Sequence, residues 1–359
     1  MKIGELCSYA PKSQIKAGEA IEGAKYMFFT SSADENKRYS EYQFDGEGII
    51  MGTGGNATLH YYSGKYSTST DCVVLLPNEK VRCKYLYYYL KANMNVLEAG
   101  FKGAGLKHTN KKYINDICID NIPDCGKQDK IIYILDKIQG IIDSKNQELK
   151  WLDYLIKARF VELFGTCKNL LSMNELCSII TDGTHQPPKF QKSGIPFIFV
   201  SNLANNTVTY DTEKFISQEI YSELYKRTPV EIGDLLLSTV GSYGHPAVVV
   251  KDKKFLFQRH IAYLKPKGNI VNSFYLHSAL LAPDGQRQIE GKVKGIAQKT
   301  LNLSEIKKIV VPIPPIEEQN EFERFVHQVD KSKVVYMYIL KTRKYLMYNS
   351  KYREKVNCI

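Results

Sequence analysis

Apolar residues recur at alternating steps of three and four along two long stretches of the chain, residues 128–164 and residues 319 to about 352. In the first stretch the repeating positions are Ile131, Leu135, Ile138, Ile142, Leu149, Leu152, Ile156 and Leu163. In the second stretch they are Phe322, Val326, Val329, Tyr336, Leu340 and Met347. This heptad spacing is typical of coiled-coil helices. The sequence therefore predicts two helices, each roughly 50 to 55 Å long at about 1.5 Å per residue.

The two helical stretches are copies of each other. Each begins at a glutamine behind an Ile-Pro step, Gln128 in the first copy and Gln319 in the second. At the spacing between these glutamines Ile131 falls on Phe322, so the apolar rhythm repeats as well. The sequence KIGELCS of residues 2–8 likewise returns as SMNELCS at residues 172–178. An internal duplication therefore covers the chain, in the order globule, helix, globule, helix.

The duplication predicts how the two helices bury their apolar stripes. A helix of this length cannot bury its stripe alone, and the simplest solution is for the two copies to pack together, antiparallel and with pseudo-twofold symmetry. The alternative is a long core helix in an ordinary bundle. We divide the chain into a first globule at residues 1–121, a central spacer helix at 122–166, a second globule at 167–313 and a C-terminal spacer helix at 314–359.

Both globules are predicted to be mixed α/β folds of the α+β kind. Each contains an acidic turn, a short apolar strand and a loop of small polar residues, at 46–56 in the first globule and at 232–245 in the second. Further short β-runs and a helix follow in each. Neither glycine loop has the GxGxxG or GxxxxGK[ST] spacing of a nucleotide-binding loop. A turn that allows close approach of another surface is therefore favoured over a phosphate site.

Composition narrows the class of protein. The 359 residues are 43% hydrophobic, and the eight cysteines are scattered without a CxxC pair, which predicts reduced thiols and no zinc site. Residues 1–13 lack the apolar segment of a signal peptide and no run reaches membrane-spanning length, so a cytoplasmic location is expected. The net charge of +11 lies mostly after residue 166 and is a weak pointer to nucleic acid.

The sequence contains no convincing constellation of catalytic residues. Asp124 with Glu148 and Lys150 imitates a nuclease PD…ExK motif, but the last two residues lie on a predicted coiled-coil helix, where the nuclease chemistry requires a strand. The seven histidines are isolated and have neither HExxH nor zinc-cluster spacing. An Asn-Pro-Pro-aromatic methyltransferase motif is also missing. The chain is therefore predicted to be non-catalytic, with no metal and no cofactor of its own.

One segment of the second copy carries a family resemblance. Residues 295–306 (GIAQKTLNLSEI), running into residues 309–319 (IVVPIPPIEEQ) and the long helix, resemble the end of a target recognition domain and the following spacer in the DNA-specificity (S) subunits of type I restriction-modification systems. Residues 105–114 and 119–123 form a weaker version in the first copy. That copy carries Asp-Cys-Gly-Lys at residues 124–127 where Pro-Ile-Glu-Glu would be expected.

The resemblance implies a function and a set of partners. Such subunits carry two target recognition domains, each reading one half of a bipartite sequence in double-stranded DNA, and two helices that act as a ruler between them. Two methyltransferase subunits dock on the spacer and globule, bind S-adenosylmethionine and methylate adenine. Restriction subunits with ATP-driven translocase and nuclease activities join the assembly. The subunit itself is expected to do no chemistry, and the two cofactors belong to its partners.

Candidate DNA contacts follow from the chemistry of recognition, since Lys, Arg and small polar groups bind phosphates while Arg, Lys, Asn, Gln, Ser, Thr and His reach base edges. In the first globule we expect contacts from Thr53, Asn56, His60, Tyr61 and Lys65, and backbone contacts from Lys102, Lys107, His108, Lys111 and Lys112. In the second we expect contacts from Thr184, His185, Lys189, Thr239, Ser242, Tyr243, His245, Arg259, His260, Lys292, Lys294 and Lys299. The alternative for each is a solvated surface residue. The two loops differ in sequence, so two different half-sites are expected.

Two other functions stay open on the sequence alone. The chain could serve a fused restriction-methylation enzyme or a methylation system without a nuclease. A different class of function is a structural adaptor, in which the globules bind proteins and the coiled coil holds a complex together. Basic loops without a salt-dependent affinity for DNA would favour the adaptor.

Overall fold

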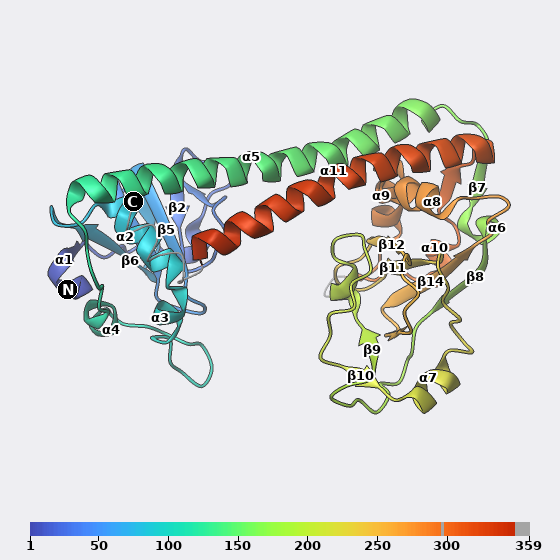
Figure 1. The fold of residues 1–359 in the computed structure, drawn as a ribbon, viewed down its shortest axis with the longest axis horizontal. Coiled ribbons are helices and arrows are strands. Elements are labelled where there is room, and N and C mark those ends of the chain that lie inside the picture. The colour runs from blue at the N-terminus through green and yellow to red at the C-terminus, as the bar shows by residue number, and fades with distance from the viewer. Residues whose placement is uncertain (296–297, 349–359) are drawn as a thin grey trace. The chain divides into compact units, whose positions relative to one another are not determined.

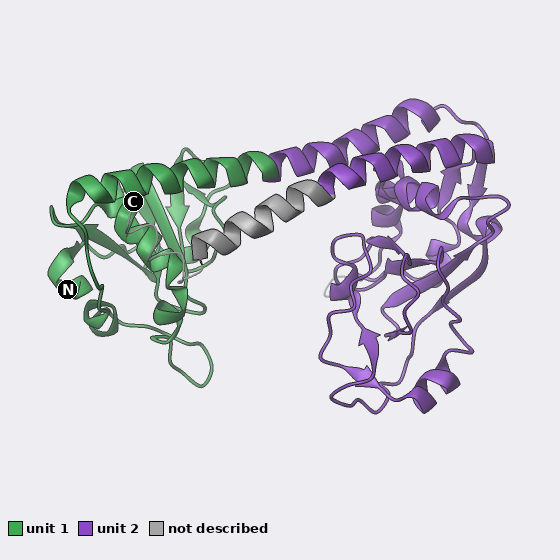
Figure 2. Ribbon diagram, in the orientation of Figure 1, with its two compact units in different colours: residues 1–145, 339–359 green, residues 146–338 purple. Residues whose placement is uncertain are grey.

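The computed structural model describes residues 1–295 and 298–348, with the side chains of residues 334–348 outside that description (Figure 1). The chain forms two compact units, which Figure 2 distinguishes by colour. The first unit is built from residues 1–145 and takes in the described residues 339–348, and the second is built from residues 146–338. Within the described part of the chain, no helix combines the length and the apolar character needed to cross a membrane.

The first unit is organised around a six-stranded sheet in the order β1-β6-β4-β5-β2-β3. Its strands are β1 (Cys7–Tyr9), β2 (Tyr26–Phe29), β3 (Arg38–Tyr39), β4 (Phe44–Gly52), β5 (Leu59–Thr68) and β6 (Cys72–Pro77). Its short helices are α1 (Ile3–Leu6), η1 (Ala17–Glu19), α2 (Cys83–Ala92), α3 (Met94–Glu98) and α4 (Lys111–Asp116). All neighbouring strands pair antiparallel except β2 and β5, which run parallel.

The second half of the central strand β4, from Gly48 onward, is buried on both faces of this sheet. Ile49 packs into one apolar cluster together with Leu86 of α2, whereas the next residue, Ile50, packs into a second cluster with Phe29 and Tyr66. Successive side chains of a strand point to opposite faces, so a run of consecutive apolar residues is what a doubly covered strand requires. The short apolar strand predicted before the glycine loop therefore forms the middle of the core.

The second unit contains three small sheets, in the orders β12-β11-β14-β8, β10-β9-β13 and β15-β7. Its strands are β7 (Leu170–Ser172), β8 (Cys177–Asp182), β9 (Ile195–Ile198), β10 (Phe215–Ile216), β11 (Leu235–Ser238), β12 (Pro246–Val248), β13 (Leu256–Phe257), β14 (Ile261–Pro266) and β15 (Val310–Pro312). Its short helices are α6 (Met173–Leu176), η2 (Val200–Leu203), α7 (Gln218–Leu224), α8 (Ser273–Leu281), α9 (Pro283–Lys292) and α10 (Leu303–Ile306). Strand β11 is buried throughout, as the second half of β4 is in the first unit.

The two predicted long helices are α5 (Cys125–Phe164) and α11 (Ile316–Tyr348), and each begins three residues before its predicted start. Inside the second unit they run antiparallel, because Asp153 of α5 forms a 2.8 Å ion pair with Lys333 of α11 while Phe164 lies against Phe322. Lys333 replaces an apolar residue in the heptad pattern, and this ion pair satisfies its charge.

The predicted apolar stripe is at least partly buried at every described position except Leu163, which is 44% exposed at the end of α5. In α5, every predicted stripe residue from Ile131 to Ile156 is partly buried. In α11, Phe322, Val326 and Val329 are buried. The three remaining predicted positions, Tyr336, Leu340 and Met347, lie outside the described side chains.

Gln128 attaches the start of α5 to the first unit. Its side chain is fully buried, at 0% exposure. Its Oε1 accepts a hydrogen bond from Arg82 N at 2.7 Å, and its Nε2 donates to Lys80 O at 3.0 Å and to Pro123 O at 2.8 Å. The amide thereby ties the helix to the backbone in front of α2.

Gln319 does the same at the start of α11 in the second unit, where it is also at 0% exposure. Its Oε1 accepts from Asn272 N at 2.9 Å, and its Nε2 donates to Ile270 O at 3.1 Å and to Pro314 O at 2.9 Å. The partners are again the backbone before a helix, here α8, and the proline step before the glutamine. The duplication read from the sequence therefore extends to individual hydrogen bonds.

Candidate nucleic-acid interface

In the first unit a hairpin loop, residues 102–108, lies against the glycine loop that follows β4. Two backbone hydrogen bonds close it, from Lys102 N to His108 O at 3.0 Å and from His108 N to Lys102 O at 2.9 Å. Gly55 N donates to Lys107 O at 2.8 Å and joins the hairpin to the glycine loop. Two segments that lie far apart in the sequence thus form one continuous surface.

The second unit repeats this arrangement with residues 294–300, of which 296–297 lie outside the described part. Lys294 N donates to Thr300 O at 2.9 Å and Thr300 N donates to Lys294 O at 2.8 Å. Gly241 N donates to Lys299 O at 3.1 Å, as Gly55 N does to the first hairpin. Each unit therefore presents a basic hairpin supported by a glycine-rich loop.

In each unit a threonine at the start of the glycine-rich loop binds the backbone just after the hairpin. Thr53 O accepts from Thr109 N at 3.0 Å, and Thr239 O accepts from Leu301 N at 2.8 Å. Thr239 is only 5% exposed, and the hydroxyl of Thr53 donates to Asp71 O at 2.9 Å. In the structure both predicted DNA contacts hold the loops in place.

Several predicted contacts of the first unit do gather at the hairpin. Asn56, Lys102, Lys107 and His108 are all exposed there. The helix α4 begins directly after the hairpin with two further exposed lysines, Lys111 and Lys112. Closely spaced cationic side chains on a projecting loop are suited to the phosphates of a nucleic-acid backbone.

The other three predicted contacts of the first unit lie elsewhere, along β5. His60 is 7% exposed, with its Nδ1 3.1 Å from Oε1 of Glu35, so its ring is inside the unit. Tyr61 points to the α2 side, where burial and a hydrogen bond to Glu47 raise its pKa. Lys65 is exposed but lies farther along the strand. Strand alternation explains why His60 and Tyr61 cannot share a face.

In the second unit the loops surround a cavity of about 290 Å³. Its polar lining comes from Asp182, Thr239, Arg259, His260, Gln298, Thr300 and Asn302. The structure therefore brings together three predicted contacts, those at positions 239, 259 and 260, which come from two separate segments. Burial and the Arg259 guanidinium lower the pKa of His260, so its ring is neutral at physiological pH.

Asp182 is a residue that the sequence reasoning missed. Its Oδ2 lies 2.8 Å from Nε2 of His185 and its Oδ1 lies 2.6 Å from a guanidinium nitrogen of Arg227. The carboxylate thus holds His185, a predicted contact, in place. Asp182 ends the apolar strand β8 and opens a small polar loop. This position at the end of a strand could have indicated a functional residue, because binding residues commonly lie in the loops that follow strands. Gln298 and Asn302 had no such signal.

The remaining predicted contacts of the second unit are spread over the same loops. Lys189, Ser242, Lys294 and Lys299 are exposed, and Thr184, Tyr243, His245 and Lys292 are partly buried. Lys299 lies over the Tyr243 ring, with Nζ 6.0 Å from its centroid. Nδ1 of His245 lies 2.9 Å from Oδ1 of Asn206, and burial lowers the pKa of this histidine.

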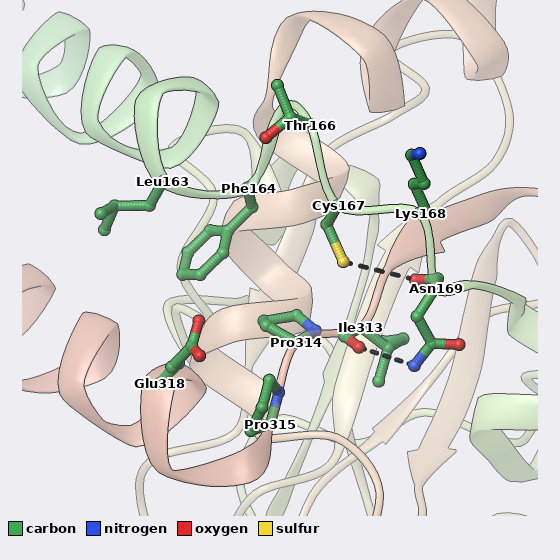
Figure 3. Close-up of a pocket in the computed structure, with 10 residues that line it drawn as sticks. All are labelled: Leu163, Phe164, Thr166, Cys167, Lys168, Asn169, Ile313, Pro314, Pro315 and Glu318. Carbon is green, nitrogen blue, oxygen red and sulfur yellow. Dashed lines mark hydrogen bonds between the residues drawn. The ribbon is translucent and has the colours of Figure 1, made fainter.

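A second hollow, of about 600 Å³, lies between the end of α5 and the start of α11 (Figure 3). Leu163, Pro314 and Pro315 give it apolar walls, and Glu318 lies at its side. The connecting segment is braced by a hydrogen bond of 2.8 Å from Nδ2 of Asn169 to Ile313 O. Its mainly apolar lining is suited to a protein side chain rather than to a phosphate.

Along the same part of α5 runs a stripe of exposed apolar side chains. Trp151, the single tryptophan of the chain, is 61% exposed, Tyr154 66%, Leu155 47% and Val161 48%. Their spacing of three, four and seven residues places them on one face of the helix. Exposed apolar patches with aromatic residues are typical of protein interaction sites.

A family model for the type I restriction-modification DNA-specificity domain matches residues 1–153 and 171–335 of the chain. The chain belongs to this family. The two matched ranges fall on the two copies of the duplication. Membership of the specificity-subunit family, which the sequence motif at residues 295–319 indicated, is thereby confirmed.

Curated members of the specificity-subunit family are similar to this chain over most of their length. The specificity subunit of the type I restriction enzyme EcoBI from Escherichia coli is 25% identical over 349 residues, covering 88% of this chain and 72% of the relative. The specificity subunit of the type I restriction enzyme MjaVIII from Methanocaldococcus jannaschii is 21% identical over 307 residues, covering 79% and 72%.

Solved structures support the fold of the specificity-subunit family. The S subunit of a type I restriction-modification system from M. genitalium superimposes with a TM-score of 0.53 at 14% identity, covering 97% of this chain and 94% of that one. A chain from a structure on complex assembly and conformational transition of the type I R-M system superimposes with a TM-score of 0.52 at 16% identity. The match covers 97% of this chain and 95% of that one. The predicted mixed fold with long helices is confirmed.

No group of three or more histidine, cysteine or acidic side chains able to hold a metal ion is found among the described residues of this specificity-subunit family member. The cysteines at positions 7 to 177 are free thiols. What the site offers instead is a set of cationic, amide and hydroxyl groups on two equivalent loop pairs.

Proposed function

We propose that each unit of this specificity subunit reads one half of a two-part sequence in double-stranded DNA. The observation that carries the proposal is the repeated basic hairpin, closed and supported by the same backbone hydrogen bonds in both units. Two copies of one DNA-binding unit suit a bipartite target, since each copy can bind its own half-site. The different side chains on the two loops suit different half-sites.

We infer that the chain is non-catalytic and that the chemistry belongs to partner subunits. Two methyltransferase subunits would bind S-adenosylmethionine and methylate adenine, and restriction subunits would use ATP. The family membership supports this division of labour. The absence of a recognisable catalytic motif in the sequence agrees with it.

The exposed stripe of α5 is where we expect a methyltransferase subunit to dock. Trp151→Ser removes the largest exposed apolar side chain of the stripe, and loss of an interface tryptophan typically weakens association by about 2 kcal/mol or more, roughly thirtyfold. Titration of the purified chain with the methyltransferase subunit measures this. Lys192→Ser, an exposed change in the loop before β9, is the control. Equal affinities of the two variants would exclude this surface.

The affinity of the complex for duplex DNA at several salt concentrations tests the DNA-reading function. A reader that neutralises several phosphates loses affinity steeply with salt, and log K falls by about 0.9 per phosphate contact for each unit of log salt. Lys299→Ala should flatten that slope by about one unit. An affinity that is weak and insensitive to salt would instead favour the structural adaptor.

A further inference from the structure

The cavity of the second unit contains an arginine whose terminal amino groups are free. Arg259 is exposed at the cavity, and its Nε donates a hydrogen bond of 3.4 Å to Nε2 of His260. Within the described part of the chain, its Nη1 and Nη2 make no hydrogen bond or ion pair. The nearby carboxylate of Asp182 is already engaged by His185 and Arg227.

The neighbouring histidine determines which part of the guanidinium is available. Because an arginine nitrogen can only donate, Nε2 of His260 is the acceptor of this hydrogen bond, and the lowered pKa of the histidine agrees with a neutral ring. With Nε occupied, the end of the guanidinium presents two parallel N–H donors. This fork matches two acceptors that lie side by side.

The backbone that carries this fork is fixed from both sides. Arg259 N donates to Thr184 O at 3.0 Å, and Thr239 N donates to His260 O at 2.9 Å. Both bonds join the turn before β14 to neighbouring loops of the same site. A side chain that reads a base requires such a rigid support.

The hydrogen-bonding groups in the cavity favour a base pair over a phosphate. The carboxylate of Asp182 lines the same cavity and, although Arg227 offsets its charge, it can only accept hydrogen bonds, and a phosphate offers it no donor. The major-groove edge of a G·C pair suits both groups. Guanine presents O6 and N7 as adjacent acceptors for an arginine fork, and cytosine presents an N4 amino donor for a carboxylate. Each oxygen of Asp182 keeps a second lone pair for that donor.

We propose that this cavity reads a G·C pair, with Nη1 and Nη2 of Arg259 donating to O6 and N7 of guanine and Asp182 facing N4 of cytosine. The assignment rests on the proposed reading of DNA by the second unit. It names the base pair at one position of that half-site and the residue that selects it.

Methylation mapping with the full complex tests the assignment. The chain and its methyltransferase subunits are expressed as wild type, Arg259→Lys and Arg259→Ala, and the methylated sequences are compared. Lysine keeps the charge but lacks the fork, so both variants should accept other bases at one guanine position of one half-site, with discrimination lowered on the order of tenfold or more. Arg324→Lys, an exposed change on α11, should leave the motif unaltered.

The outcomes separate this inference from the function on which it rests. A wild-type complex without a two-part motif would overturn the proposed function, and this assignment with it. A two-part motif that stays unchanged in both Arg259 variants would overturn the assignment alone. A loss of affinity that is equal for all sequences would also overturn it, because it would make Arg259 a phosphate contact. Measured affinities for duplexes with the G·C pair replaced by A·T decide between these results.

Discussion

Two buried glutamines, Gln128 and Gln319, have their amide oxygen and both amide hydrogens bonded to backbone groups. A buried polar group is tolerated only when it is satisfied, and removing one partner leaves the others unpaired. Because the same three kinds of partner recur in both units, the glutamine is a structural element of the repeat. It fixes where each long helix leaves its unit.

Replacing Gln319 by leucine should therefore destabilise the second unit. The change leaves Asn272 N, Ile270 O and Pro314 O without their partner, and each unsatisfied buried group costs about 1–3 kcal/mol. We expect a loss of about 3 kcal/mol or more in the free energy of unfolding, measured by urea denaturation. Gln328→Leu, at an exposed position of the same helix, should change it by less than about 0.5 kcal/mol. Similar losses in both variants would contradict the assigned role.

His277 in α8 should make the second unit sensitive to acid. Desolvation lowers its pKa, and its Nε2 lies 3.1 Å from Asn206 O. Below about pH 6.5 the histidine of the unfolded chain therefore binds a proton that the folded unit does not bind. The contribution of this histidine to the free energy of unfolding is fully present above that pH and is lost as the pH falls towards the folded pKa. One proton gives a slope of at most about 1.4 kcal/mol per pH unit.

Unfolding of the wild type and of His277→Gln between pH 5 and pH 7 measures this contribution. The variant should lose less stability on acidification than the wild type. His327→Gln, at an exposed position of α11, is the matched control and should keep the wild-type slope. Identical pH profiles of wild type and His277→Gln would show that this histidine contributes nothing.

At the scale of elements, the basic hairpins depend on special backbone conformations. Gly103 has a φ of +147°, and a Cβ at that position would lie 2.7 Å from Leu106 O. Gly105 in the same loop has open space at its Cβ position. Only the first glycine is required for the turn, because an L-residue at positive φ is strained and here would also clash.

Gly103→Ala should distort the first hairpin, whereas Gly105→Ala should not. The strain of roughly 1–3 kcal/mol is expected to move the lysines of the loop out of the positions in which we propose that they bind phosphates. Affinity of the complex for its target duplex should fall in the first variant and stay at the wild-type value in the second. Equal affinities would mean that the hairpin conformation does not matter for DNA binding.

Elements with a local signal could be predicted from the sequence, and those that depend on distant pairing could not. The long helices follow from the heptad pattern, and the buried strands β4 and β11 follow from short apolar runs. The contact of the glycine loop with the hairpin joins Gly55 to Lys107, more than fifty residues later, and no local pattern encodes such a pairing. The buried His60 illustrates the same limit, since its environment comes from Glu35 in another segment.

At the scale of the whole molecule, the helix α5 runs without interruption from the first unit into the second. Its apolar stripe and the antiparallel contact with α11 inside the second unit support a spacer function. We therefore expect the length of the two helices to set which separation of half-sites is accepted.

Deleting one heptad from each long helix tests the spacer function. The deletion shortens a helix by about 10 Å, or roughly three base pairs of B-form DNA, while keeping the apolar stripe in phase. The complex should accept a shorter gap between its half-sites or lose binding. Deleting two residues from each helix would break the phase and serves as the control for general damage. An unchanged gap after the heptad deletion would remove the ruler hypothesis.

The most direct measurement is a map of adenine methylation in DNA from cells that express this chain together with its methyltransferase subunit, compared with cells that express the methyltransferase alone. If the two units read two half-sites, a new methylated motif in two parts appears only when this chain is present. No new motif in the presence of a soluble and active methyltransferase would contradict the claim that this chain supplies the sequence specificity.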